Sequence, residues 1–390
     1  MSGLTPSAEE PLPEALRQHS EAVHQRIREE IGLHGPMPFD RYMELALYAP
    51  GIGYYTGGAG KFGAEGDFTT APECSPLFAG CLARQCMQVL RPGDDVIEFG
   101  AGSGQLAVDL LTALDELDSL PARYLIVELS ADLRARQQRK LRELAPKYLE
   151  RIDWLERLPE RHDGVVIANE VLDAMPVSRF LHDGSGPMEM FVGAGGGALQ
   201  SIWKPIQTPG LAAFIDENVP LAKLPTPYIS EVAPRAVAWI HAIGRLPGRR
   251  LALLVDYGYP RDEYYLPERD RGTLMCYFRH RAHADPFRHP GIQDITAHVD
   301  FTALARAALA AGMRIAGYTS QANFLLASGL EEQLAKQDPA DTGKWMKTVQ
   351  AVKTLTLPSG MGERFRVMAL TRGIDDTLDG FRLRDLRNRL

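Results

Sequence analysis

Short apolar runs that alternate with amphipathic segments constrain the fold of this chain more than any other feature of its sequence. Each run is too short for a buried helix and ends in polar or glycine residues, as in DVIEF (95–99), YLIVE (124–128) and GVVIA (164–168). The segments at 105–117 and 131–144 have apolar residues at helical spacing. Strands and helices in this order predict βαβ units, and therefore a mostly parallel sheet flanked by helices.

The rest of the chain extends this α/β pattern and suggests insertions. Further strands are expected near 152, at 251–256 and at 363–370, and further helices at 14–31, 39–48 and 75–90. The expected parts are N-terminal helices with a glycine-rich lid (1–74), the first part of the core (75–176), an inserted β-rich element (177–230) and the second part of the core (231–390), which has a helical insertion around 260–345. The lid contains the stretch 50–73, whose glycines and aromatic residues favour a loop that covers a ligand.

Charge and cysteine content narrow the classes of function. A net charge of −7 and a pI of about 5.9 give no overall basic character, so we expect no nucleic-acid partner. No apolar run reaches the roughly 18 residues of a membrane span, and residues 1–14 have neither a signal-peptide nor an Arg-rich transit pattern. We therefore expect no membrane association. The four cysteines, Cys74, Cys81, Cys86 and Cys276, form no Cys-x-x-Cys pair, which favours reduced packing residues and a cytoplasmic protein.

A glycine-rich turn follows the first expected strand, in DVIEFGAGSGQLA (95–107). Gly100, Gly102 and Gly104 occupy every second position, which lets the backbone turn sharply and lets a ligand approach it without a Cβ contact. The spacing lacks the last glycine of a dinucleotide fingerprint, and no P-loop lysine follows. Glu98 would repel a pyrophosphate placed nearby. The pattern therefore favours a ligand without phosphate groups, and a turn that binds no ligand is the alternative.

The second expected strand ends in Glu128, which supports a nucleoside ligand. An acidic side chain at this position can accept hydrogen bonds from both hydroxyl groups of a ribose. Trp154, just after the third expected strand, is a candidate for stacking on adenine, and an ordinary core tryptophan is the alternative.

The fourth expected strand leads into candidate catalytic groups. Asn169 and Glu170 follow it directly, and in open α/β sheets such residues line the ligand crevice. Glu170 and Asp173 are three residues apart, so one helical turn would place both carboxylates on one side. Two carboxylates can hold a guanidinium, and one can accept its proton. Acids that simply favour a helix N-terminus are the alternative.

Other polar residues are weaker candidates. Asp256 and Tyr257 end the fifth expected strand beside the same crevice and are candidates for substrate contact, and Glu231 is a further one. His298 could act as a general base, although a structural role is the better interpretation. The histidines at 280–289 have no spacing that is typical of a metal site, so we expect no metal.

The chain resembles the MidA family of S-adenosylmethionine-dependent methyltransferases. The matching motifs occur in order over nearly the whole chain: YMELALYAPGIGYY (42–55), GDFTTAPECSPLF (66–78), IEFGAGSGQLA (97–107), ANEVLDAMPV (168–177), VDYGY (255–259), GTLMCYFRH (272–280), GIQDITAHVDF (291–301) and MGERFRVMAL (361–370). This resemblance implies a Rossmann-like class I methyltransferase fold with a helical lid and inserted elements. It also implies donor contacts by Glu98, Gly100, Ala101, Gly102, Gly104, Glu128, Leu129 and Asn169, with the lid residues Asp67 and Thr69 covering the donor.

The sequence therefore predicts an enzyme that uses S-adenosylmethionine and releases S-adenosylhomocysteine. The resemblance implies a protein arginine side chain as the methyl acceptor, held by Glu170 with Asp173 or Asp256. Two alternatives remain open: a small-molecule or RNA methyltransferase, and a non-catalytic assembly factor that binds the donor as a structural ligand.

Overall fold

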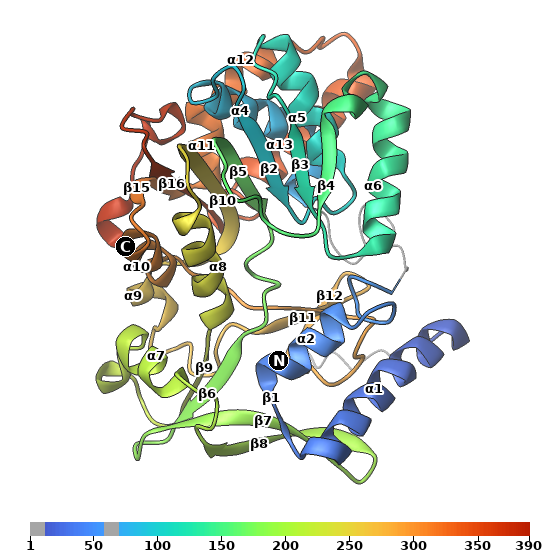
Figure 1. Cartoon of the computed structure of the whole chain (residues 1–390), viewed down its shortest axis with the longest axis vertical. Helices are drawn as coiled ribbons and strands as arrows, with labels where there is room; N and C mark the ends of the chain where they lie inside the picture. Colours follow the sequence, from blue (N-terminus) through green and yellow to red (C-terminus); the bar gives the residue numbers. More distant parts are fainter. Residues whose placement is uncertain (1–11, 58–69) are drawn as a thin grey trace, which may run out of the picture.

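The computed structural model describes residues 12–57 and 70–390, and an eight-stranded sheet forms the centre of this part of the chain (Figure 1). The strand order is β15–β16–β10–β5–β2–β3–β4, with β14 paired to the end of β10. Strands β4, β3, β2, β5 and β10 run parallel, and β16 is antiparallel to both of its neighbours. Their bounds are β2 (Asp95–Phe99), β3 (Tyr124–Val127), β4 (Ile152–Leu155), β5 (Gly164–Asn169), β10 (Arg250–Tyr259), β14 (Val299–Asp300), β15 (Arg314–Ser320) and β16 (Phe365–Arg372).

This sheet confirms the fold class that the alternating pattern predicts. β2 covers the same residues as the first expected strand, and β3 and β5 differ from their predictions by one residue. Both faces of β2 and β5 are buried, which explains why their sequences are continuous apolar runs. Because β2, β3 and β5 run parallel, their carboxyl ends meet at one edge of the sheet, where open α/β sheets bind their ligands.

Helices cover both faces of the core sheet. On one face α4 and α5 pack together, joined by residues of α11, α12 and α13, whereas α8 and α10 cover the other face. The helix bounds are α4 (Pro76–Met87), α5 (Gln105–Glu116), α6 (Ala131–Leu144), α8 (Pro234–Arg245), α10 (Phe301–Ala310), α11 (Gln321–Ala327), α12 (Leu330–Ala335) and α13 (Thr342–Thr356). The expected helices at 75–90, 105–117 and 131–144 correspond to α4, α5 and α6.

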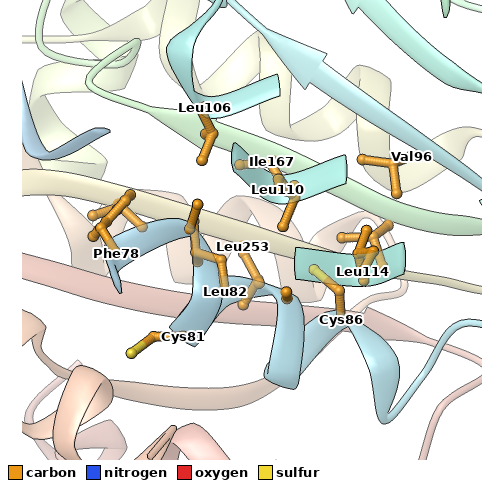
Figure 2. Close-up of a cluster of buried hydrophobic side chains, with 14 of the residues drawn as sticks. Phe78, Cys81, Leu82, Cys86, Val96, Leu106, Leu110, Leu114, Ile167 and Leu253 are labelled. Atoms are coloured by element: carbon orange, nitrogen blue, oxygen red, sulfur yellow. The ribbon is translucent and has the colours of Figure 1, made fainter. Parts of the chain in front are cut away.

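Buried apolar side chains of α4 and α5 pack against each other and against the core sheet (Figure 2). Leu82 and Cys86 of α4 and Leu110 of α5 are fully buried, beside Ile167 of β5 (Figure 2). Cys86 is here a packing residue, as its sequence context predicts. This apolar layer holds the strands of the core sheet and the turn after β2 in place, because closely packed interiors resist deformation.

A second group of elements lies at the end of the molecule opposite α4 and α5 (Figure 1). It contains an antiparallel sheet of five strands, ordered β1–β7–β6–β9 with β8 on β7, and a three-stranded sheet, β12–β11–β13, both within the described residues. The strands are β1 (Met37–Pro38), β6 (Ser178–His182), β7 (Pro187–Gly195), β8 (Ala198–Pro205), β9 (Tyr228–Val232), β11 (Met275–Phe278), β12 (Arg281–His283) and β13 (Asp294–Thr296). Its helices are α1 (Glu14–His34), α2 (Phe39–Tyr48) and α7 (Leu211–Asn218). The short helices α3 (Ala71–Cys74) and α9 (Arg261–Tyr264) belong to the core, where α3 contacts α4 and α5, and α9 contacts β10 and α10.

The stretch 260–345, expected as a helical insertion, contains the helices α9, α10, α11 and α12 and the start of α13, and it also contains strands. It contributes the three strands β11–β13, and it contains β15, which is an edge strand of the core sheet. The sequence pattern is misleading here because the antiparallel strands β11 and β12 are short and mostly not buried, so they lack a strong alternation of apolar residues.

Short 3-10 helices complete the described part of the chain: η1 (Pro146–Arg151), η2 (Leu221–Lys223), η3 (Asp379–Phe381) and η4 (Arg387–Arg389). Among the helices of residues 12–57 and 70–390, none is both long and apolar enough to cross a membrane.

Candidate functional site

A cavity of about 410 Å³ lies at the carboxyl ends of β2, β3 and β5, and its size is typical of a small-molecule site. Residues of the turns after these three strands form its floor, while α2 and α8 supply walls from the two sides. Among the predicted site residues, those that line it are Glu98, Gly100, Ala101, Gly102, Glu128, Leu129, Asn169 and Glu170. The predicted lid residues Asp67 and Thr69 lie outside the described residues.

The turn after β2 has the backbone that its glycines predict. Gly100, Gly102 and Gly104 have φ values of 60°, 53° and 83°, a left-handed region that other residues rarely adopt. A Cβ atom on Gly100 would lie 3.2 Å from Cγ2 of Val171, so the turn also packs closely against the turn after β5. Gly104 was predicted to contact the methyl donor, but it does not line the cavity and is instead the N-cap of α5.

Glu128 is fixed at the end of β3 by two donors. The backbone N–H of Ser130 donates to its Oε1 at 2.9 Å, and Nε2 of Gln137 donates to its Oε2 at 3.0 Å. The same Nε2 donates to the carbonyl of Gly102 at 3.0 Å, so Gln137 connects the two ligand-binding turns. Burial raises the pKa of Glu128 above its ordinary value. Each Oε atom keeps a lone pair, which suits a carboxylate that receives ribose hydroxyls.

Trp154 does not stack in the cavity as the sequence analysis proposed. It packs against the apolar core beneath the sheet, and its Nε1 donates to Oε1 of Gln137 at 2.9 Å. β4 is an edge strand of the core sheet, and Trp154 does not line the cavity. Trp154 thus orients Gln137, whereas Leu129, with 77% of its surface exposed, is the apolar residue beside Glu128 on the cavity rim.

Glu98 is a buried carboxyl group on the floor of the cavity. Only 3% of its surface is exposed, and the hydroxyl of Tyr124 donates to its Oε2 at 2.7 Å. Burial, together with the nearby charge of Glu128, raises its pKa to about 7. A cationic group of a ligand would stabilise the ionised form of this carboxyl and would therefore be attracted to it.

Glu170 follows β5 in a bend and not in a helical turn, which corrects the prediction for this segment. Its φ is 54°, and its Oε1 accepts the N–H of Ala71 at 3.2 Å and Nδ2 of Asn169 at 3.1 Å. Burial and the charge of Asp173 raise its pKa to about 8. Oε2 has no hydrogen-bond partner within residues 12–57 and 70–390 and is available to a ligand.

Asp173 and Asp256, predicted as further catalytic carboxylates, do not line the cavity. Asp173 is 6% exposed and interacts with the side chain of Tyr257, and burial raises its pKa to about 6. Asp256 is 0% exposed, and its oxygens accept backbone N–H groups. The bend after Glu170 explains the correction, because without a helical turn the side chains of residues 170 and 173 diverge.

The side of the cavity next to α2 and α8 contains aromatic residues, of which Tyr55 belongs to the expected lid while Tyr48 and Trp239 were not predicted. Tyr48 of α2 and Tyr55 stack with ring centroids 5.4 Å apart, and Trp239 of α8 meets Phe99 edge-on at 5.0 Å. Nε1 of Trp239 is buried and has no partner among the described residues. No sequence signal marks Trp239, because α8 has the pattern of an ordinary amphipathic helix that covers a sheet.

Ion pairs between α8 and α2 lie on the same side of the cavity. Nη2 of Arg235, on α8, lies 3.0 Å from Oδ2 of Asp40 and 3.2 Å from Oε2 of Glu44, both on α2. Glu44 and Arg235 line the cavity. The pair connects the core sheet to the N-terminal helices, so the cavity lies between the two parts of the molecule.

The remaining weak candidates lie elsewhere. Glu231 is fully buried, pairs with Arg179 at 3.0 Å and accepts the N–H of Thr273 at 2.8 Å, which makes it a structural carboxylate. Burial lowers the pKa of His298 to about 4, and its ring stacks on Tyr259, so a structural role fits it better than a general base. Among the described residues no group of three or more acidic, histidine or cysteine side chains could hold a metal ion.

The residues of the cavity fit S-adenosylmethionine. Oδ1 of Asn169 is a buried acceptor without a partner among the described residues, and Glu98 and Glu128 are acidic groups at the ends of adjacent strands. Such acceptors suit the ammonium and ribose hydroxyl groups of the donor. The Gly100–Gly102 turn lets an adenosine or methionine moiety approach the backbone.

Comparisons with known proteins agree with this site. The family model described as "Putative S-adenosyl-L-methionine-dependent methyltransferase" matches residues 81–319, more than half of the chain. A protein from Burkholderia thailandensis, whose crystal structure contains bound S-adenosyl-homocysteine, is 45% identical, with a TM-score of 0.93, and the match covers 98% of this chain and 100% of that one.

More distant relatives carry a named activity. The mitochondrial protein arginine methyltransferase NDUFAF7 homolog of Caenorhabditis elegans is 27% identical over 88% of this chain and 84% of its own length. The human protein arginine methyltransferase NDUFAF7 is 28% identical over 95% of this chain and 86% of its own length. The chain belongs to the S-adenosyl-L-methionine-dependent methyltransferases of the MidA-like family that its motifs predict.

Proposed function

We propose that this methyltransferase transfers its methyl group to an arginine side chain of a protein. The observation that carries the proposal is the free Oε2 of Glu170, a partly buried carboxylate oxygen that lies in the same cavity as the donor-binding turns. A carboxylate at this place can hold a guanidinium by a charge-assisted hydrogen bond. The names of the animal relatives, which are protein arginine methyltransferases, support the same acceptor.

The charges around the cavity also favour a cationic acceptor. The acidic residues that line it are Glu44, Glu73, Glu98, Glu128 and Glu170. Arg235, the basic side chain among the described lining residues, is already paired with Asp40 and Glu44. Because the raised pKa values of Glu98 and Glu170 fall when a cation enters, binding a guanidinium stabilises their charged forms.

Aromatic rings complete the binding site for a flat cation. Tyr48, Tyr55 and Trp239 line the cavity beside Met175. Aromatic faces attract a guanidinium by cation–π interaction, worth about 0.5–2 kcal/mol each. They also exclude water, which strengthens the bond between the guanidinium and Glu170.

The residues of the chain account for the transfer by orientation and proton acceptance. S-adenosylmethionine supplies an electrophilic methyl group on its sulfonium. Glu170 would hold the guanidinium so that one nitrogen faces this methyl group. As the new N–C bond forms, the bond between the methyl carbon and the sulfur breaks, S-adenosylhomocysteine leaves, and the carboxylate accepts the proton that the nitrogen loses. Its raised pKa of about 8 makes it a stronger base than an ordinary carboxylate.

The first experiment is methyl labelling. Purified protein and S-adenosylmethionine with a labelled methyl group are incubated with a lysate from a strain that lacks the gene, beside the Glu170→Gln and Glu189→Gln variants. Glu189 is a matched control, because it is a buried glutamate whose carboxylate accepts backbone N–H groups outside the cavity. We expect a labelled protein band with the wild type and with Glu189→Gln, but not with Glu170→Gln, and mass spectrometry should place the methyl on arginine.

Other outcomes distinguish the alternatives. Label found only in RNA or in small molecules would show that the acceptor is not a protein arginine, while the protein would still be a methyltransferase. No label in any fraction, with S-adenosylhomocysteine binding intact by calorimetry, would favour the assembly factor. Turnover by Glu170→Gln equal to the wild type would remove Glu170 from the mechanism.

The compartment is a further part of the proposal. We propose the cytoplasm, since all four cysteines are unpaired and Cys81, Cys86 and Cys276 are fully buried, which is typical of proteins in a reducing compartment. Fractionation of the source cell with an antibody against the protein tests this, and recovery from an organelle fraction would contradict it.

A further inference from the structure

Glu170 reaches the cavity from an unfavourable backbone conformation. Its φ of 54° lies in the left-handed region, which is unfavourable for a non-glycine residue. The conformation brings the carboxylate to the N–H of Ala71 and to the cavity, whereas Asp173, three residues later, faces Tyr257. Contacts elsewhere must therefore hold the bend between these two residues.

The end of β10 provides these contacts. The N–H of Glu170 donates to the carbonyl of Val255 at 2.9 Å. Oδ2 of Asp256 then accepts the N–H of Leu172 at 2.9 Å and that of Asp173 at 3.3 Å. Oδ1 of Asp256 accepts the N–H of Tyr257 at 2.9 Å. A single buried side chain thus fixes the backbone of Leu172 and Asp173, two and three residues after Glu170, and is itself fixed to its own strand.

We propose that Asp256 is a positioning residue for methyl transfer, which holds the bend at 170–173 so that the Glu170 carboxylate faces the acceptor. The proposal rests on the proposed function of Glu170. Asp256 is fully buried and does not line the cavity, so it cannot contact the acceptor itself. Its action passes through the backbone of Leu172 and Asp173.

The chemistry of the contacts explains why an aspartate stands here. Burial and the charges of Asp173 and Glu170 raise the pKa of Asp256, and the three backbone N–H groups that its two oxygens accept oppose this shift by stabilising the carboxylate form. In Asp256→Asn one oxygen could still accept the N–H groups of Leu172 and Asp173, but the amide N–H₂ would then face the N–H of Tyr257. The amide N–H₂ and the N–H of Tyr257 are both donors, so neither would have an acceptor in this buried place. We therefore expect the bend at 170–173 to shift, although asparagine has the same shape as aspartate.

A matched pair of variants tests the proposal. Asp256→Asn is compared with Asp300→Asn, because Asp300 also accepts two backbone N–H groups, those of Thr302 and Ala303, at the start of α10 and away from the cavity. For each variant the unfolding temperature, the affinity for S-adenosylhomocysteine by calorimetry, and kcat and KM for labelled methyl transfer are measured. Hydrogen exchange of the amides at 170–173 and of Ala71 is followed in the same samples.

We expect kcat of Asp256→Asn to fall about 10- to 100-fold, because displacements near 1 Å have such effects on transfer. Its affinity for S-adenosylhomocysteine and its KM for S-adenosylmethionine should stay within about threefold of the wild type. Amides at 170–173 and at Ala71 should exchange faster. Asp300→Asn, in which Oδ1 still accepts both N–H groups, should leave kcat unchanged.

Two results would overturn the proposal. In the first, kcat is the same in Asp256→Asn and Asp300→Asn, so that the role is only structural. In the second, donor affinity and kcat fall by the same factor, so that Asp256 shapes the donor site instead. If the wild type methylates no acceptor, the proposed function fails, and hydrogen exchange alone decides: equal protection of 170–173 in both variants would contradict positioning.

Discussion

At the scale of single residues, the donor end of the cavity depends on backbone conformations that glycine alone adopts at little cost. Gly102 has a φ of 53° and lines the cavity, so a side chain here would both strain the backbone and enter the donor site. We expect Gly102→Val to lower the affinity for S-adenosylhomocysteine by at least about 100-fold, measured by calorimetry.

A second glycine supplies the control for this prediction. Gly93 has a φ of 92° and no heavy atom within 4 Å of an added Cβ, and it precedes β2 on the surface. Gly93→Val should therefore have comparable strain and normal binding. Equal affinities in Gly102→Val and the wild type would remove this turn from the donor site.

The pH dependence of transfer is also a property of one residue. The ionised form of Glu170 is the form that accepts a proton, and burial with the charge of Asp173 raises its pKa to about 8. We expect kcat/KM for the acceptor to rise with pH from 6 and to level off above about 8, because this ratio follows the free enzyme. The rise in kcat should lie at lower pH, since a bound cation lowers the pKa.

Initial rates of labelled methyl transfer between pH 6 and 9 measure both profiles. Glu170→Gln should lose the rise in kcat/KM along with most of its activity. A rate that does not change with pH in the wild type, or a rise that persists in Glu170→Gln, would show that another group sets the profile.

At the scale of elements, the contact between α2 and α8 encloses the acceptor side of the cavity. Arg235 pairs with Asp40 and Glu44, but 38% of its side chain is exposed, so the pair contributes about 1 kcal/mol or less. We expect Arg235→Met to speed hydrogen exchange in α2 and to lower the unfolding temperature by only about 1–2 °C.

Arg161→Met is the control, because Arg161 forms an exposed pair with Asp163 away from the cavity. The affinity for S-adenosylhomocysteine should be unchanged in both variants. Unchanged exchange in α2 of Arg235→Met would mean that apolar packing alone holds this helix against the core.

The elements themselves could be predicted best where one periodicity dominates. The strands β2, β3 and β5 are buried on both faces, so their residues are apolar without interruption, and the segments of α5 and α6 are amphipathic. The stretch 260–345 could not be predicted in this way. Its strands β11 and β12 are half exposed and short, and β15 reaches the core sheet only through its pairing with β16, which is about 50 residues away in the sequence.

At the scale of the whole molecule, several buried acids should make stability depend on pH. Burial raises the pKa of Asp173 to about 6, that of Glu98 to about 7 and that of Glu170 to about 8. Each folded-state pKa lies above the unfolded value, so the folded protein binds more protons in this range. The stability that these groups contribute is therefore complete below their unfolded pKa values and is lost as the pH rises through about 6 to 8.

We expect the free energy of unfolding of the ligand-free protein to fall by on the order of 2–4 kcal/mol between pH 6 and 8.5. Thermal unfolding at both values measures it. The double variant Glu98→Gln/Glu170→Gln should have a smaller fall, and saturating S-adenosylmethionine, a cation, should also reduce it. A stability that rises over this interval would contradict the raised pKa values.

The sequence by itself determined the layered α/β core, the family and the donor-binding turns. These depend on local signals: apolar periodicity, and glycines at positions that require a left-handed backbone, as at Gly100 and Gly102. The places of Glu128 and Glu170 could also be predicted from the sequence, because the carboxyl ends of parallel strands lie at one edge of the sheet whatever the course of the connecting loops.

Only the tertiary structure decided which polar residues face the cavity. Asp173 and Asp256 stand beside Glu170 in the chain or in the sheet, yet neither lines the cavity, because of the bend at Glu170 and the contacts of Asp256. Trp239 and Tyr48 reach the cavity from helices far apart in the sequence. Side-chain direction at the end of a strand depends on one or two backbone angles, and the surrounding packing sets those angles, which no local pattern records.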